Sequence, residues 1–371
     1  MTKIIKIPFI LVMVLFLISG CTSKVPKEDK AQFTATAILP LTGDLSFLGD
    51  PGKNALELAK KDLDKKGEVV FTYSLVDSKA EAKEAVTEAI KAVDIDNRKI
   101  LITTLTGPSL SVRDSMKGKN ILVAAIAIHP DLPQEGSPLI RFCYSGKQEA
   151  DILVDKIGQS KEPVGLIVST DASTDYQVKN IIIPEFKRRG IEIKFVEWFQ
   201  VGQKDFKNLV ALQLKNKVKR ILLLGYGSDF PRVLEALLNT GTLPQLTIYG
   251  GIGFVEIGQL KTEFSKAKYV ITAPAFVLGL SGEEGKKFRE EYKGSFGKEP
   301  SYDAAYTYDA VMILAKIIKE TKSADPNTIR NAILKKKFSG VTGELRFDNK
   351  GESTSTIYLS TFKEGLLVKE Q

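Results

Sequence analysis

Two stretches of sequence decide the fold class of this chain: Ile100-Leu101-Ile102-Thr103-Thr104-Leu105 and Ile121-Leu122-Val123-Ala124-Ala125-Ile126-Ala127-Ile128. Both are apolar along nearly their whole length, whereas half-buried strands alternate between apolar and polar residues. Continuous apolar strands are typical of a parallel sheet that helices cover on both faces. The two stretches therefore predict strands of an α/β fold.

The same pattern of strands and helices extends to either side. Upstream lie apolar strands at Phe33–Leu39 and Val69–Val76, each followed by a segment with apolar residues at helical spacing. Downstream, the pattern restarts with a strand at Val164–Ser169 and a helix at Asp175–Arg189. A long amphipathic helix is predicted at Tyr302–Thr321. We therefore expect two lobes, each with a mainly parallel sheet and helices on both faces.

The composition excludes several classes of protein. The chain has 371 residues, 43% hydrophobic and 26% charged, which is typical of a globular protein with room for two domains. Lysine and arginine exceed aspartate and glutamate by 53 − 45 = 8, but the excess is scattered, so no nucleic-acid partner is expected. Two cysteines and one histidine exclude a disulfide scaffold and the common zinc motifs, and we expect no metal and no cofactor.

The common motifs of enzyme sites are absent. Gly225-Tyr226-Gly227 and Gly251-Ile252-Gly253 each lack the third glycine of a dinucleotide-binding loop, and neither a phosphate-binding loop nor a Gly-x-Ser-x-Gly turn occurs. Cys143 lies in an apolar stretch, which favours a buried, inert thiol. His129 precedes Pro130, where it is either an exposed turn residue, a ligand contact or the base of a hydrolase.

The N-terminus has the features of a cleaved secretory signal. Lys3 and Lys6 precede the apolar run Ile7–Ile18, which is short for a membrane span. The residues Leu17-Ile18-Ser19-Gly20-Cys21 resemble a bacterial lipobox. That resemblance implies a signal peptide over residues 1–20, a diacylated Cys21 and a polar tether over residues 21–31.

In its ordered series of motifs, the chain resembles the type 1 periplasmic binding proteins of the leucine/isoleucine/valine-binding branch. The motifs are Ala37-Ile38-Leu39-Pro40-Leu41-Thr42-Gly43, Lys204-Asp205-Phe206, Pro300-Ser301-Tyr302 through Tyr308-Asp309-Ala310-Val311, and Phe338-Ser339-Gly340-Val341-Thr342-Gly343. The resemblance implies a two-lobed flytrap whose chain crosses between lobes near Arg141-Phe142, Thr272-Ala273-Pro274 and Thr342-Gly343. Lobe one would comprise residues 32–141 plus 274–341, and lobe two residues 142–273 plus 342–371.

The resemblance also implies which residues contact the ligand. They follow the strands that face the cleft or close over it from lobe two: Thr106, Ser109, Ala127, Ile128, His129, Tyr176, Tyr226, Ile252 and Phe276. The family has a glutamate near Ile252 that pairs with the ligand ammonium, and here Asp171 or Asp229 would have to replace it. We therefore expect a pocket more apolar than an amino-acid pocket, with an uncharged or aromatic ligand preferred to a free amino acid.

The function that this resemblance implies is binding without catalysis. We expect an extracytoplasmic, lipid-anchored, monomeric protein that captures a small molecule, an amino acid or a related compound, between its lobes and delivers it to the permease subunits of an ABC importer. The alternatives are a ligand-sensing receptor subunit of the same fold, and an extracytoplasmic hydrolase that uses His129.

Overall fold

A computed structural model describes residues 30–43 and 45–370 of the chain. The residues from Ala31 onward form one compact unit. The predicted signal peptide, Cys21 and nearly all of the predicted tether lie outside the described residues. Across the described ranges, no helix combines the length and the apolar character that a membrane span requires.

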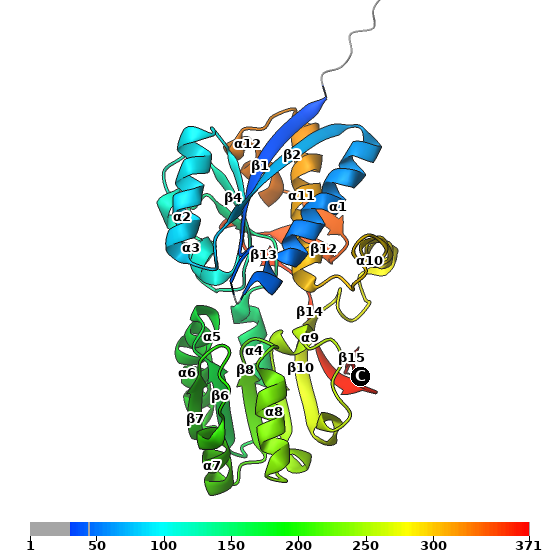
Figure 1. The fold of residues 1–371 in the computed structure, drawn as a ribbon. Helices are drawn as coiled ribbons and strands as arrows, with labels where there is room; N and C mark the ends of the chain where they lie inside the picture. Colours follow the sequence, from blue (N-terminus) through cyan, green and yellow to red (C-terminus); the bar gives the residue numbers. More distant parts are fainter. Residues whose placement is uncertain (1–29, 44, 371) are drawn as a thin grey trace, which may run out of the picture. The chain divides into compact units, whose positions relative to one another are not determined.

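The first sheet is wholly parallel, as its apolar strands predict (Figure 1). Its strand order is β2 (Val69–Asp77), β1 (Ala31–Leu39), β3 (Ile100–Thr104), β4 (Leu122–Ile126) and β5 (Leu139–Arg141). One face packs against α1 (Asp50–Lys66), α11 (Tyr302–Thr321) and α12 (Pro326–Leu334). The other face packs against α2 (Ala82–Ile90) and α3 (Thr106–Ser115). Because both faces are covered, the strands are apolar at successive positions.

The second sheet has seven strands; five of them pair in parallel, and the two at one edge are added through antiparallel pairing. Its order is β15 (Leu366–Lys369), β14 (Ile357–Lys363), β10 (Lys268–Pro274), β9 (Thr247–Gly250), β8 (Arg220–Leu224), β6 (Val164–Ser169) and β7 (Ile193–Phe199). One face packs against α4 (Gly146–Ile157) and α6 (Ile183–Arg189), and the other against α7 (Lys207–Asn216) and α8 (Phe230–Asn239). Each sheet therefore has its own core, as the two repeated βα patterns predict.

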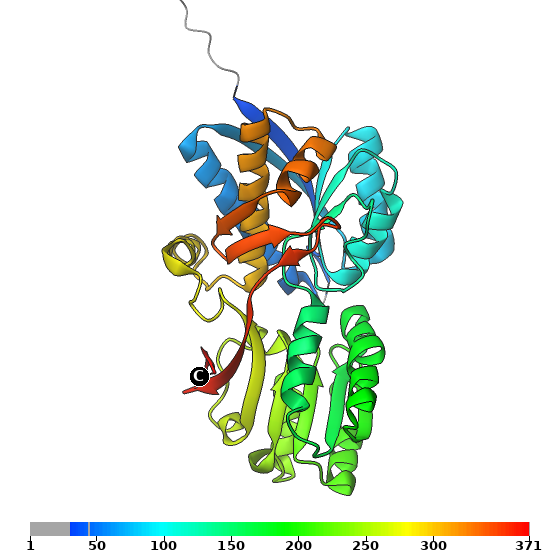
Figure 2. The same cartoon turned by 180° about the vertical axis from the view of Figure 1, so that it is seen from behind.

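A small antiparallel sheet follows α12. Its position shows that the third crossing between the large sheets lies later in the chain than expected. It consists of β11 (Lys337–Gly340), β12 (Gly343–Phe347) and β13 (Ser353–Thr354). Its residues Leu345 and Phe347 pack in the same core as α11, and Figure 2 shows its orange-red strands beside that helix. The expected crossing at Thr342-Gly343 therefore lies inside this sheet. The chain reaches the seven-stranded sheet only between β13 and β14.

Three further α-helices lie in the described part of the chain. α5 (Ala172–Gln177) and α9 (Gly253–Glu256) each follow a strand of the seven-stranded sheet closely. α10 (Gly282–Phe296) packs through Phe288 and Tyr292 against α1. The short helices α5 and α9 begin in loops at the carboxyl ends of parallel strands, where open α/β sheets bind their ligands.

Candidate functional site

A cavity of about 80 Å³ lies at the carboxyl ends of strands from both large sheets. Thr104 and Ile126, the last residues of β3 and β4, line it from the five-stranded sheet. Gly225 and Tyr226, which directly follow β8, line it from the seven-stranded sheet. Since each water-sized group needs about 10–15 Å³, the cavity accommodates about five to eight such groups. Its position at the carboxyl ends of parallel strands is where open α/β sheets bind their ligands.

Five of the residues that the sequence predicts as ligand contacts line this cavity. Four of them lie directly beyond strands, and Thr106 is the first residue of α3: Thr106, Ala127, Ile128, Tyr226 and Ile252. The structure therefore brings together residues that are up to 146 positions apart in sequence, since 252 − 106 = 146.

Ser109 and Phe276 do not line the cavity. Ser109 is fully buried in α3, and its hydroxyl donates a hydrogen bond to Thr103 Oγ1 at 2.9 Å. Phe276 is buried in a cluster with Phe288, and the Arg289 guanidinium lies 4.8 Å from the centre of its ring. Each side chain therefore has a partner within the protein: the Ser109 hydroxyl has a hydrogen bond, and the Phe276 ring has packing contacts.

His129 and Tyr176 contact each other outside the cavity lining. Their ring centres are 4.5 Å apart, and the Tyr176 hydroxyl donates a hydrogen bond to Asp131 Oδ1 at 3.1 Å. His129 Nδ1 accepts a hydrogen bond from the Asp131 backbone N–H, and burial lowers the pKa of His129. His129 is buried and is not among the residues that line the cavity.

The lining of the cavity combines apolar residues with acidic side chains, two of which the sequence did not predict there. Three carboxyl groups line the cavity, those of Asp171, Glu256 and Asp303. Glu256 lies four residues after Ile252, one turn further along the same helical segment. This helical spacing could have indicated Glu256 as a lining residue, but the comparison of single positions did not identify it. Of the two suggested replacements, Asp171 lines the cavity, whereas Asp229 is fully buried beside Arg232.

Burial changes the protonation of two of these carboxyl groups. Burial raises the pKa of Glu256 to about 8, although its Oε2 accepts a 2.8 Å hydrogen bond from the Gly227 backbone N–H. Burial raises the pKa of Asp303 to about 7. Each group keeps some accessible surface, and each lines the cavity. Perturbed carboxyl groups in a concave site are a common property of ligand-binding sites.

Two hydroxyl groups on the cavity lining lack hydrogen-bond partners among the described residues. Thr104 Oγ1 and Ser173 Oγ are both buried, with their residues 4% and 5% exposed. An unpaired hydroxyl group in the interior costs free energy, so such groups are normally paired with protein, water or ligand.

The cavity also exposes no reactive thiol. Cys143 lines it, but burial raises the pKa of this thiol to about 12, which favours the neutral and unreactive form. This agrees with the inert thiol that the sequence predicts. Within the described residues, no group of three or more metal-ligating side chains is arranged to hold a metal ion.

The two Gly-x-Gly sequences allow their loops to come into direct contact. A Cβ atom on Gly253 would lie 2.1 Å from the Gly225 carbonyl oxygen, and one on Gly227 would lie 2.3 Å from the Gly253 carbonyl oxygen. A Cβ on Gly251 would lie 2.8 Å from the buried Glu149 Oε1, which accepts a hydrogen bond from the Ile252 N–H. These glycines therefore fix the loops that carry Tyr226, Ile252 and Glu256.

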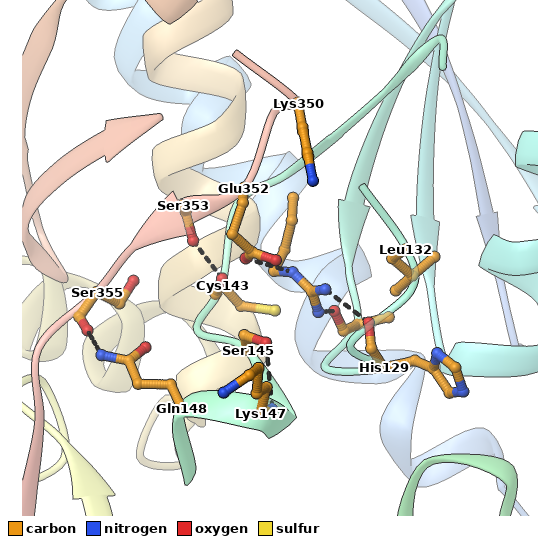
Figure 3. A network of polar contacts seen from close by, with 12 residues as sticks. His129, Leu132, Cys143, Ser145, Lys147, Gln148, Lys350, Glu352, Ser353 and Ser355 are labelled. Carbon is orange, nitrogen blue, oxygen red and sulfur yellow. Dashed lines mark hydrogen bonds and ion pairs between the residues drawn. The ribbon is translucent and has the colours of Figure 1, made fainter. Parts of the chain in front are cut away.

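A buried arginine fixes the loop after β4, which carries Ala127 and Ile128. Arg141 is fully buried and donates hydrogen bonds to the carbonyl oxygens of Ala127 and His129, both at 2.6 Å. Its Nε also forms an ion pair with Glu352 Oε1 at 2.7 Å. Figure 3 shows the contacts around Glu352, where the Ser353 hydroxyl donates to the Cys143 carbonyl oxygen. The arginine thus connects the cavity loop after β4 with its own segment at the end of β5 and with the segment of Glu352.

Known proteins share both the sequence pattern and this architecture. The family model for the periplasmic binding proteins matches residues 33–365. The chain is 22% identical over 329 residues to the leucine-, isoleucine-, valine-, threonine- and alanine-binding protein of Pseudomonas aeruginosa, covering 84% of this chain and 85% of that protein.

Solved structures show the same fold. The solute-binding protein of an ABC transporter from Rhodopseudomonas palustris, in complex with 3,4-dihydroxybenzoic acid, superposes with a TM-score of 0.80 at 17% identity, covering 92% of this chain and 97% of that one. A leucine-binding protein from Thermotoga maritima superposes with a TM-score of 0.76 at 23% identity, covering 91% and 98%. The resemblance inferred from the sequence motifs is confirmed. The chain therefore belongs to the periplasmic binding protein family, with the two-lobed α/β fold of its type 1 members.

Proposed function

We propose that this protein captures a small polar molecule in the cavity between its two lobes and delivers it to the permease of an ABC importer. Proteins with the same fold include binding proteins for branched-chain amino acids and for a dihydroxybenzoate. These relatives share the architecture but differ in ligand, so the ligand of this chain must follow from its own side chains.

The observation that carries the proposal is the cavity lining. Both sheets contribute strand ends to one cavity, and the hydroxyl groups of Thr104 and Ser173 within it have no partner in the described chain. A ligand enclosed there would contact both lobes at once. Binding would therefore stabilise the closed arrangement of the lobes, which is the state that a permease recognises.

The location and the anchor follow from different observations. Family membership implies an extracytoplasmic location. The lipid anchor at Cys21 is our proposal, supported by the lipobox-like residues before it and by the polar residues that separate it from β1. We also propose that the protein acts as a monomer, with the ABC permease as its partner.

Calorimetric titration with a panel of amino acids, amines, amides and aromatic carboxylates tests the proposal. We expect one compound to bind with a stoichiometry of one and to be recovered unchanged. Recovery of a hydrolysed or otherwise altered compound would contradict a binding function. Absence of binding across the panel and across a wider metabolite screen would contradict it as well.

A further inference from the structure

The charge of the cavity lining distinguishes it from an apolar pocket. Asp171, Glu256 and Asp303 line it, and no lysine, arginine or histidine of the described chain does. None of the three carboxyl groups forms an ion pair with a basic side chain among the described residues. The cavity lining is therefore acidic, and no basic side chain in the described part of that lining would compensate the carboxyl groups when they ionise.

The three carboxyl groups come from separate elements. Asp171 caps α5 by accepting hydrogen bonds from the backbone N–H groups of Ser173 and Thr174. Glu256 is the last residue of α9 and accepts from the Gly227 N–H, and Asp303 lies in the first turn of α11 with a hydrogen bond from Tyr302. Each is therefore held in place by its own lobe or helix, while carboxylate oxygens have capacity for further donors.

A single metal ion does not account for this arrangement. A metal site requires several ligands converging on one point. No set of three acidic, histidine or cysteine side chains in the described chain converges in that way. Carboxyl groups on three separate elements can each accept a donor from a different part of one organic molecule.

Two further observations point to a ligand with hydrogen-bond donors. The buried hydroxyl groups of Thr104 and Ser173 line the same cavity without protein partners. In addition, burial raises the pKa values of Glu256 and Asp303, and repulsion from the carboxyl groups of Asp303, Asp171 and Asp229 raises the pKa of Glu256 further. A bound cation would relieve that repulsion.

We propose that the ligand is a small organic cation with two ammonium groups, a diamine or a dibasic amino acid. This inference rests on the proposed function, since it names the class of solute that the cavity receives. One ammonium group would bind between Asp171 and Glu256 of the second lobe, and the other at Asp303 of the first.

Matched pairs of ligands test this inference by calorimetry. We expect putrescine to bind at least tenfold more tightly than butylamine, or lysine at least tenfold more tightly than norleucine, because each pair differs by one ammonium group. Tight binding of putrescine identifies a diamine, and tight binding of lysine a dibasic amino acid; both support the inference. If norleucine or leucine binds as tightly as lysine and butylamine as tightly as putrescine, the inference is wrong while the proposed function remains.

A charge-removing variant adds a second readout. Asp303→Asn keeps the shape of the side chain, and we expect it to weaken putrescine or lysine binding at least tenfold and the monoamine partner much less. Asp175→Asn is the control, because Asp175 carries the same charge on α5 but is absent from the cavity lining. Equal losses for both members of a ligand pair in Asp303→Asn, with normal thermal unfolding, would overturn the inference.

Discussion

Replacement of Arg141 by methionine tests whether the buried arginine positions the cavity loop. The change keeps an unbranched side chain of similar length but removes every donor. The carbonyl oxygens of Ala127 and His129 then lose their hydrogen bonds of 2.6 Å, and Glu352 loses its ion-pair partner at 2.7 Å. Because Arg141 is fully buried, water does not easily replace these contacts.

The expected loss of stability is large. Removing one partner of a buried ion pair typically costs about 3–5 kcal/mol in the free energy of unfolding. Glu352 keeps 26% of its side chain exposed and can be partly rehydrated, so we expect about 3 kcal/mol, at the lower end of that range. Urea denaturation measures the loss. Hydrogen exchange of the segment 126–129 measures the loop separately, and we expect faster exchange there.

Arg220→Met is the matched control. Arg220 is 3% exposed and donates to the carbonyl oxygens of Ile157 and Glu162, in the second lobe and outside the cavity lining. It should also destabilise the protein, but it should not change exchange at residues 126–129. If Arg141→Met leaves exchange of that segment as in the wild type, or if both variants accelerate it equally, the positioning role is refuted.

Three further predictions concern the anchor, the loop packing and the pH dependence. Cys21→Ser should release the protein into the soluble fraction; a variant that stays membrane-bound and keeps residues 1–20 would contradict the lipoprotein proposal. Gly251→Ala should lower stability by about 1–3 kcal/mol because its Cβ would lie 2.8 Å from Glu149 Oε1, whereas Gly294→Ala on α10, with open space around it, should not lower it. Folding raises the pKa of Glu256 to about 8 from an unfolded value of about 4.3. Between these pH values the folded state therefore binds more protons than the unfolded state, and the stability of the ligand-free protein should fall as pH rises from 5 to 8. Chemical denaturation at pH 6 and pH 8 measures this fall, which should be smaller in Glu256→Gln; an equal fall in the variant would exclude Glu256 as its source.

The architecture was predictable because apolar strands and amphipathic helices are local properties of the sequence. The strands β3 and β4 are buried on both faces, and their mainly apolar residues indicate this directly. The order of motifs then identified the family. The third crossing was misplaced because the hairpin β11–β12 packs on the first lobe, and nothing local in Thr342-Gly343 distinguishes a hairpin turn from a linker.

The charge of the cavity was not predictable position by position. Ile252 suggested the loss of an acidic partner, but Glu256, one helical turn later, supplies a carboxyl group to the same cavity. In the sequence, Asp303 resembles an ordinary acidic residue in the first turn of a helix, where a negative charge interacts favourably with the helix dipole. Its role depends on the packing of α11 beside strands from the other end of the chain, which is a long-range property of the fold.

The central claim is that the ligand binds in the cavity between the two lobes, and blocking that cavity tests it most directly. Ile128 lines the cavity and is partly exposed, so Ile128→Trp places an indole group in the space while Ile128→Val leaves it open. The measurement is calorimetric titration of both variants with the tightest-binding compound of the panel. We expect at least a hundredfold loss of affinity in Ile128→Trp and less than a threefold change in Ile128→Val. Wild-type affinity in a folded Ile128→Trp variant would contradict the account.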